Sequence, residues 1–360
     1  MEDSLEGRSA GKVIDARGLV VAPGFIDPHS HTDVELLVNP KAESKIRQGV
    51  TTEIGGNCGF TAFPLSSLNI EKTRHYLKEK YDFDLNWADV DTFFRRLEVC
   101  GMAVNYATLL GHGNVRGAVL GMEDRCATAE EIERMRLVVR KHLEAGVFGL
   151  SSGLIYTPGC YAEAEEIIEL CREVAQFNGI YATHMRNESD FLIEAVEESI
   201  RVARESHVSL QISHIKLAYP RNWPKVHEVL SRISQVAQEG IKIMADRYPY
   251  IATSTFLSVL MPPWLRQGST EDYLKRLGDP RYDAMIQEYF EEQEARIGSW
   301  ESIRISSVVT DQNLRFIGKT IEEAARSEGK KPYLHIRDLL IAEKDQVEMI
   351  NFSLNEDSFR

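Results

Sequence analysis

Residues 23–31 read Pro23-Gly24-Phe25-Ile26-Asp27-Pro28-His29-Ser30-His31, so a short apolar run ends in two histidines spaced two residues apart. Alternate side chains of a β-strand point to the same face, and a strand over 19–27 would therefore aim both imidazoles the same way. Two ring nitrogens in that arrangement can hold a metal ion. Two surface histidines near a loop are the other interpretation, and the pair alone does not decide between them.

Similar features recur at the ends of three other strand-like runs. A cysteine follows the run 50–55 inside the glycine-rich stretch 55–59, and a histidine ends each of the runs 179–184 and 208–214. A lone cysteine is most often a buried structural thiol, but this one stands at a strand end like the histidines. The four strand ends together predict a metal site built from His29, His31, Cys58, His184 and His214.

Strand-like and helix-like segments alternate along most of the chain, which favours parallel strands joined by crossover helices. Strands are predicted at 19–27, 50–55, 104–110, 147–152, 179–184, 208–214 and 241–246. Helices are predicted at 41–48, 88–99, 128–145, 162–177, 189–206 and 224–239. The helix at 162–177 has a clear apolar stripe of Ala164, Ile167, Ile168, Cys171, Val174 and Ala175.

This pattern predicts an α/β fold of the TIM-like (β/α)8 type, but it supplies seven strands where a closed barrel needs eight. The chain after Arg247 follows another pattern, and we expect an apolar, proline-containing loop at 251–264. A strand is then expected at 303–309, with helices at 271–277, 281–295, 319–328 and 335–344. The eighth barrel strand is expected to be missing.

Composition narrows the class of protein. The 360 residues carry a formal net charge of −13, which opposes binding to nucleic acid or to an anionic membrane. No stretch reaches the roughly 18 uninterrupted apolar residues of a membrane span. The five cysteines are widely spaced and contain no CxxC pair, so a reducing, cytoplasmic compartment is expected. The oligomeric state is not predicted.

Six motifs in the chain resemble those of the D-aminoacylases (N-acyl-D-amino-acid deacylases) of the metal-dependent amidohydrolase superfamily. They are PGFIDPHSHTD (23–33), GVTTEIGGNCGF (49–60), GVFGLSSGLIYTPG (146–159), YATHMRNE (181–188), LQISHIK (210–216) and ADRYPYIATST (245–255). The Gly-Asn-Cys-Gly and His-Met-Arg motifs are more specific for this branch than the two histidines. The resemblance implies a barrel of the amidohydrolase type.

The resemblance also implies the metal and its ligands. Cys58, His184 and His214 would hold a tightly bound zinc ion, and His29 with His31 would form a second, weaker position. The residue types suit this role, because zinc favours thiolate and imidazole ligands, and three protein ligands leave a fourth position for water. Water bound at such a position has a pKa near roughly 7 and can attack an amide carbonyl.

A pocket for a small anionic amide substrate is implied as well. In the family pattern, Lys216 and Tyr156 would engage the substrate carboxylate, together with Ser254 and Tyr248. Arg186 stands two residues after His184, as Lys216 does after His214, and is a second cationic candidate. Solvated basic residues at strand ends, and ordinary loop packing for Tyr156 and Ser254, are the alternative interpretations.

The chain departs from the family pattern at both ends. Relatives carry a general acid–base aspartate in a Ser-Asp-Gly context at the end of the eighth strand, and no such motif follows residue 300. Of the small N-terminal β-sandwich, only Lys12 to Val21 corresponds. We therefore expect residues 1–22 to be a remnant of that sandwich and residues 23–360 to be an incomplete barrel, truncated at both ends.

Two classes of function follow. The first is zinc-dependent hydrolysis of the amide bond of an N-acyl-D-amino acid, or of another amide such as a D-configured dipeptide. The second is a zinc-binding but inactive fragment, because general acid–base help typically contributes about 10²- to 10⁴-fold and its carrier is expected to be missing.

Overall fold

The computed structural model describes residues 11–65 and 70–359. Seven parallel segments of the chain form two β-sheets. One of these segments, residues 105–111, contributes a strand to each sheet. The first sheet has the order β1 (Phe25–Asp27), β2 (Val50–Gly55) and β3 (Asn105–Thr108). The second has the order β4 (Leu110–Gly111), β5 (Gly149–Gly153), β6 (Ile180–His184), β7 (Ser209–Ile212) and β8 (Ile243–Ala245). Only Leu109 separates β3 from β4, so the predicted run of seven strands is confirmed.

The strand register places the carboxyl ends of neighbouring strands side by side. Gly153 pairs with His184 at the end of β5 and β6, and Thr183 pairs with Ile212 at the end of β6 and β7. Because every neighbouring pair is parallel, residues that follow different strands meet at the same edge of the sheets. This edge carries the candidate site.

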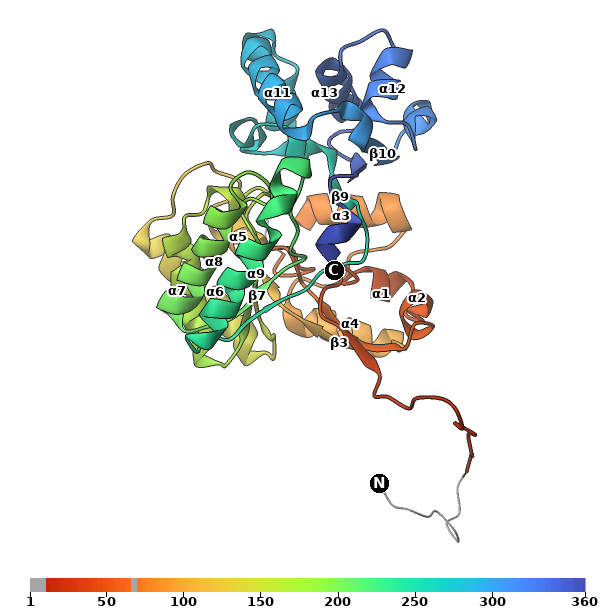
Figure 1. The fold of residues 1–360 in the computed structure, drawn as a ribbon, viewed down its shortest axis with the longest axis vertical. Helices are drawn as coiled ribbons and strands as arrows, with labels where there is room; N and C mark the ends of the chain where they lie inside the picture. The colour runs from red at the N-terminus through yellow and green to blue at the C-terminus, as the bar shows by residue number, and fades with distance from the viewer. Residues whose placement is uncertain (1–10, 66–69, 360) are drawn as a thin grey trace.

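Helices cover the outer side of the strands (Figure 1). Those beside the first sheet are α1 (Glu35–Val38), α2 (Glu43–Ile46) and α4 (Val90–Cys100). A further helix, α3 (Ile70–Tyr81), lies near the C-terminal end of the chain in Figure 1. Those beside the second sheet are α5 (His112–Val119), α6 (Ala129–Glu144), α7 (Ala164–Gln176), α8 (Leu192–Ser206) and α9 (Val226–Gln238). The apolar stripe predicted on α7 is buried except at Ala175, which is half-buried. Each fully buried apolar side chain contributes about 1.5–3 kcal/mol.

Several local predictions were wrong. The strand expected over 19–27 begins only at Phe25, whose N–H donates to the Gly49 carbonyl oxygen (2.9 Å), and residues 19–24 are exposed. The helix expected over 41–48 is a single turn, α2. Sequence patterns also missed α3 and α5. His112 begins α5 and is fully buried.

Residues 253–351 form a separate antiparallel sheet and four helices with an apolar core of their own. An antiparallel sheet has the order β10 (Ile303–Ser307), β11 (Glu348–Asn351) and β9 (Thr253–Phe256). It is accompanied by α10 (Thr270–Leu277), α11 (Asp283–Ile297), α12 (Ile321–Ser327) and α13 (Pro332–Ala342). The expected loop at 251–264 was therefore wrong in part, because it contains β9 and two short 3-10 helices, Leu257–Leu260 and Pro263–Arg266.

Two hydrophobic clusters reflect this arrangement. One extends from Leu36 to Val236 around the parallel strands, and the other from Leu257 to Met349. In Figure 1 the second cluster, with α11 to α13, stands above the body formed by the parallel strands and their helices. The domain boundaries expected at 1–22 and 23–360 stay a prediction.

Polar contacts attach the second cluster to the parallel strands. The hydroxyls of Tyr156 and Thr255 are 3.0 Å apart, and the Tyr161 hydroxyl donates to the Pro263 carbonyl oxygen (2.9 Å). On another side, the Tyr219 N–H donates to the Ser353 carbonyl oxygen (2.8 Å). These contacts bring β9 to the edge where the parallel strands end.

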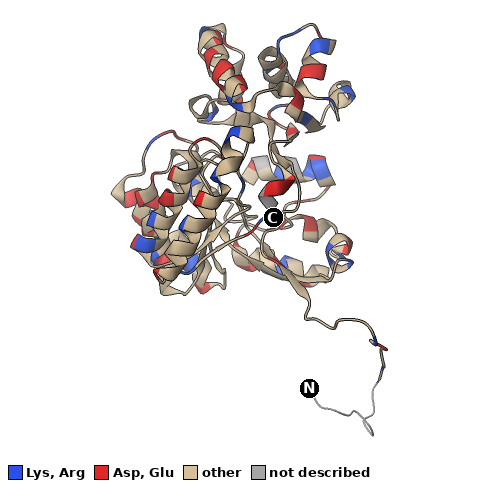
Figure 2. Cartoon of the chain, in the orientation of Figure 1, with Lys and Arg blue, Asp and Glu red and all other residues tan. Residues whose placement is uncertain are grey.

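The surface carries both signs of charge. Figure 2 shows acidic and basic residues interspersed along the outer helices of both clusters. Among residues 11–65 and 70–359, no helix combines the length and the apolar content needed to cross a membrane.

Candidate metal centre

All five predicted ligands lie at the carboxyl edge of the parallel strands. His29 and His31 follow β1, Cys58 follows β2, His184 is the last residue of β6, and His214 comes two residues after β7. Each therefore stands where its strand gives way to a loop. The parallel topology brings together residues that are up to 185 positions apart in the chain.

The side chains converge on the sulfur of Cys58. Cys58 Sγ is 3.4 Å from His29 Nε2 and 3.3 Å from His214 Nε2. The ring centroids of His184 and His214 are 4.4 Å apart, and those of His29 and His31 are 5.4 Å apart. Two ligand groups result, one of His29, His31 and Cys58, the other of Cys58, His184 and His214. Within each group the ligand atoms lie within 4.8 Å of one another, and Cys58 belongs to both.

The ring nitrogens of His184 fit a metal ligand. His184 is buried, and neither Nδ1 nor Nε2 has a hydrogen-bond partner among the described residues. A buried polar atom without a partner is unfavourable by about 1–3 kcal/mol, and a coordinated metal would remove that cost. One thiol and four imidazoles also match the ligand preference of zinc.

Two carboxylates contact the far sides of the imidazoles. Asp246 Oδ1 lies 3.1 Å from His29 Nδ1 and accepts the backbone N–H of His214 (2.7 Å). Glu188 Oε1 lies 3.1 Å from His214 Nδ1, and its Oε2 lies 3.3 Å from His184 Nε2. Carboxylates in such positions orient ligating histidines.

Burial determines the protonation states of Cys58, His184 and His214. It raises the pKa of the Cys58 thiol and lowers the pKa of His184. The pKa of His214 is also lowered, first by burial and then by the charge of Lys216. Both imidazoles are therefore neutral near pH 7, as coordination requires, whereas the thiol must lose a proton when it binds a metal.

The loop that carries Cys58 is held in an uncommon conformation. Cys58 has φ 55° and His214 has φ 38°, both in the left-handed region that non-glycine residues seldom occupy. Such strain costs on the order of 1–3 kcal/mol per residue and persists only where neighbours enforce it. Ser151 on β5 is one such neighbour, because its hydroxyl accepts the Gly59 N–H (3.0 Å) and donates to the Gly56 carbonyl oxygen.

Three of the predicted substrate residues surround the ligands. Lys216 is buried, with Nζ 2.7 Å from His214 Nδ1 and paired with Glu188. The Tyr156 ring lies 5.1 Å from the His184 ring, between centroids. The Tyr248 ring lies 5.8 Å below Lys216 Nζ and 6.4 Å from the His214 ring.

The other two predicted substrate residues are not brought into this cluster. Arg186 is held by Glu198 (Nε to Oε2, 3.0 Å) and by the Ala162 carbonyl oxygen (2.7 Å). Ser254 is exposed on β9, and its neighbour Thr255 makes the contact with Tyr156. Because adjacent strand residues face opposite ways, Ser254 points away from Tyr156.

Sequence reasoning missed Glu188 and Thr255. The signal for Glu188 was present, because a carboxylate four residues after a ligating histidine is close enough to reach it when the chain turns. Three histidines outside this group are also buried. They are His142, His335 and His112, and His112 Nε2 lies 2.7 Å from Glu166 Oε1.

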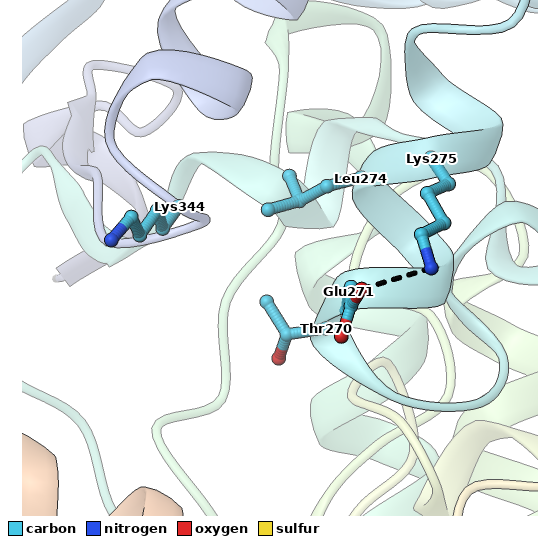
Figure 3. A pocket seen from close by; sticks show the side chains of 5 residues that line it. All are labelled: Thr270, Glu271, Leu274, Lys275 and Lys344. Atoms are coloured by element: carbon cyan, nitrogen blue, oxygen red, sulfur yellow. Dashed lines mark ion pairs between the residues drawn. The ribbon is translucent and has the colours of Figure 1, made fainter.

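A surface hollow of about 450 Å³ lies apart from these residues (Figure 3). It is lined by Thr270, Glu271, Leu274 and Lys275 of α10, with Lys344 facing them. Glu271 and Lys275 form an ion pair of 2.9 Å across one side. None of the predicted site residues lines this hollow.

Gly153 gives a test of the packing around Cys58. A Cβ at residue 153 would lie 2.1 Å from the Cys58 carbonyl oxygen, so Gly153→Ala must displace the loop. We expect the free energy of unfolding to fall by about 1–3 kcal/mol in chemical denaturation. The control is Gly117→Ala in α5, where a Cβ meets nothing within 4 Å and should stabilise by about 0.5–1 kcal/mol. Unchanged stability of Gly153→Ala would contradict the packing described.

Comparison with known proteins supports the family assignment. The chain is 40% identical over 255 residues to a D-aminoacylase of Alcaligenes xylosoxydans xylosoxydans, covering 70% of this chain and 52% of that protein. It is 40% identical over 246 residues to an N-acyl-D-aspartate deacylase of the same organism, covering 68% and 49%. The chain thus spans about half the length of these curated relatives.

Solved structures show the same relationship. An N-acyl-D-glutamate deacylase from Bordetella bronchiseptica, complexed with zinc and a phosphonate inhibitor, aligns with TM-score 0.74 and 29% identity over 93% of this chain and 61% of that one. A D-aminoacylase described as having a binuclear metal centre aligns with TM-score 0.78 and 31% identity over 99% and 65%. These alignments support a TIM-like amidohydrolase fold.

The model of the amidohydrolase family matches residues 12–295, which include every candidate ligand and the end of each parallel strand. The chain belongs to the amidohydrolase family.

Proposed function

We propose that this chain carries the metal-binding centre of a zinc-dependent hydrolase that cleaves the amide bond of N-acyl-D-amino acids. The products would be a carboxylate and a free D-amino acid. The observation that carries the proposal is the position of Cys58 in both ligand groups. The similarity to D-aminoacylase and to N-acyl-D-aspartate deacylase supports the substrate class.

The metal would be held by the residues that converge on Cys58. We assign one tight zinc position to Cys58, His184 and His214, which are all buried, and a weaker one to His29, His31 and Cys58, where His31 is exposed. A bound zinc ion supplies a Lewis acid for the amide carbonyl and for water. The binuclear centre named for the related D-aminoacylase supports two positions.

The remaining side chains would bind and orient the substrate. Lys216 offers a buried ammonium beside His214, and an anionic substrate is the natural ligand of a cation in that place. Tyr156 and Tyr248 offer hydroxyls and ring faces on either side, and they would exclude water from the reacting amide. We assign no substrate contact to Arg186, which is already paired with Glu198.

The family's general acid–base aspartate has no counterpart among the described residues. Neither the Ser-Asp-Gly motif nor an eighth parallel strand occurs in the described residues. We therefore infer an incomplete barrel with little of the small β-sandwich. Zinc binding without turnover is the second candidate function, and hydrolysis of another amide, such as a D-configured dipeptide, is a variant of the first. The five cysteines are all free thiols, and a cytoplasmic location stays a prediction.

Hydrolysis of N-acetyl-D-methionine tests the proposed activity. Zinc-loaded protein should release D-methionine from this substrate and not L-methionine from its enantiomer, and Cys58→Ala should abolish release because it removes the shared ligand. Liberated amine is the readout. Cleavage of the L-form at the same rate would contradict the substrate assignment. Zinc binding without cleavage of either form would favour the second candidate function.

The pH dependence of metal binding tests the ligand assignment. The raised pKa of Cys58 means that raising the pH increases its thiolate fraction, whereas the imidazoles of His184 and His214 are already neutral. One proton is then released per tightly bound metal. The apparent Zn²⁺ association constant should rise about tenfold per pH unit between roughly pH 6 and 8, measured by chelator competition.

The matched control for this titration is Cys58→Ser, which keeps the shape but has no titrating thiol. Its affinity should be weaker and should lose the tenfold dependence on pH. An equal slope in the two proteins would show that the released proton comes from another group, and Cys58 would not be the ligand.

A further inference from the structure

Glu188 contacts three functional groups of the candidate centre at once. We propose that Glu188 is a positioning residue that fixes the imidazoles of His184 and His214, and the ammonium of Lys216, in one arrangement. The inference rests on the proposed function, because it assigns a role toward the tight metal position. It adds a residue that neither the sequence motifs nor the family comparison assigned.

The contacts of Glu188 come from both of its carboxylate oxygens. Oε1 lies 3.1 Å from His214 Nδ1 and pairs with Lys216 Nζ, while Oε2 lies 3.3 Å from His184 Nε2. The side chain is 13% exposed, so water screens these contacts weakly. Glu188 is thus the described carboxylate that contacts the imidazoles of both His184 and His214.

The imidazole nitrogens of His214 and His184 have different neighbours. His214 directs Nε2 to the sulfur of Cys58 (3.3 Å) and Nδ1 to Glu188. His184 Nε2 lies 3.3 Å from Glu188 Oε2, and neither of its buried ring nitrogens has a hydrogen-bond partner among the described residues. His214 Nδ1 also lies 2.7 Å from Lys216 Nζ, so the carboxylate, the ammonium and the two rings contact one another. Glu188 would therefore fix the orientation of both rings from the side that faces away from Cys58.

Glu188 also compensates the charge of Lys216. That ammonium is buried, and a buried charge without a partner is strongly unfavourable. The same carboxylate thus connects the ligand pair to the residue proposed to bind the substrate. Other carboxylates nearby are engaged elsewhere, since Asp246 contacts His29 and Glu198 pairs with Arg186.

Cobalt binding measures the positioning role without relying on catalysis. Co²⁺ is titrated into metal-free protein, and the thiolate-to-cobalt absorption band reports coordination by Cys58. Glu188→Gln keeps the size of the side chain but loses its charge and one acceptor oxygen. We expect its Co²⁺ dissociation constant to rise about 10- to 100-fold. The matched control Glu198→Gln removes a carboxylate from an arginine pair in the same region, and it should bind Co²⁺ as the parent protein does.

A double variant separates positioning from charge compensation. In Glu188→Gln with Lys216→Met, no buried ammonium is left unpaired, so a loss caused only by that charge, including poor folding, should be reversed. The positioning role predicts that Co²⁺ binding stays weak in the double variant, with an altered cobalt spectrum. Recovery of parent affinity would overturn it, and so would unchanged affinity in Glu188→Gln. A parent protein that gives no thiolate band would overturn the proposed metal centre, and this assignment with it.

Discussion

The contact of one sulfur with imidazoles from both parallel sheets is the constraint on which the site depends. Cys58 follows β2 in the first sheet, whereas His214 follows β7 in the second, yet Sγ and Nε2 are 3.3 Å apart. That distance requires both sheets to curve toward each other, with the single run 105–111 joining them. Cys58 and His214 both hold left-handed backbone angles. Gly59, next to Cys58, packs directly on the backbone of β5, because a Cβ there would lie 2.7 Å from Gly153 N.

The second cluster contributes to this edge from outside the parallel strands. β9 belongs to its antiparallel sheet, and Thr255 on β9 contacts the hydroxyl of Tyr156 beside His184. The edge that carries the candidate ligands is therefore in contact with a strand of the antiparallel sheet.

The sequence alone predicted the candidate ligands whose positions follow from strand periodicity. His29, His31, Cys58, His184 and His214 were each predicted from a strand end, and parallel pairing brings such ends together. Contacts made by loops and by the second cluster could not be predicted in the same way. Whether Ser254 or Thr255 faces the ligands depends on the register of β9 with β11, and the apolar pattern of 251–264 does not show that strand. Glu188 was missed because its role depends on how the chain turns after β6. The extent of β1 was overestimated, since its apolar residues before Phe25 find no partner strand among the described residues.

The most direct test of the account is anomalous X-ray diffraction from crystals of the zinc-loaded protein. The account predicts a zinc peak about 2.3 Å from Cys58 Sγ and about 2.0–2.1 Å from one nitrogen each of His184 and His214. A second, weaker peak is predicted between Cys58 and the pair His29 and His31. Zinc bound elsewhere, or bound to the histidines with Cys58 outside coordination distance, would contradict the claim that this thiol organises the centre.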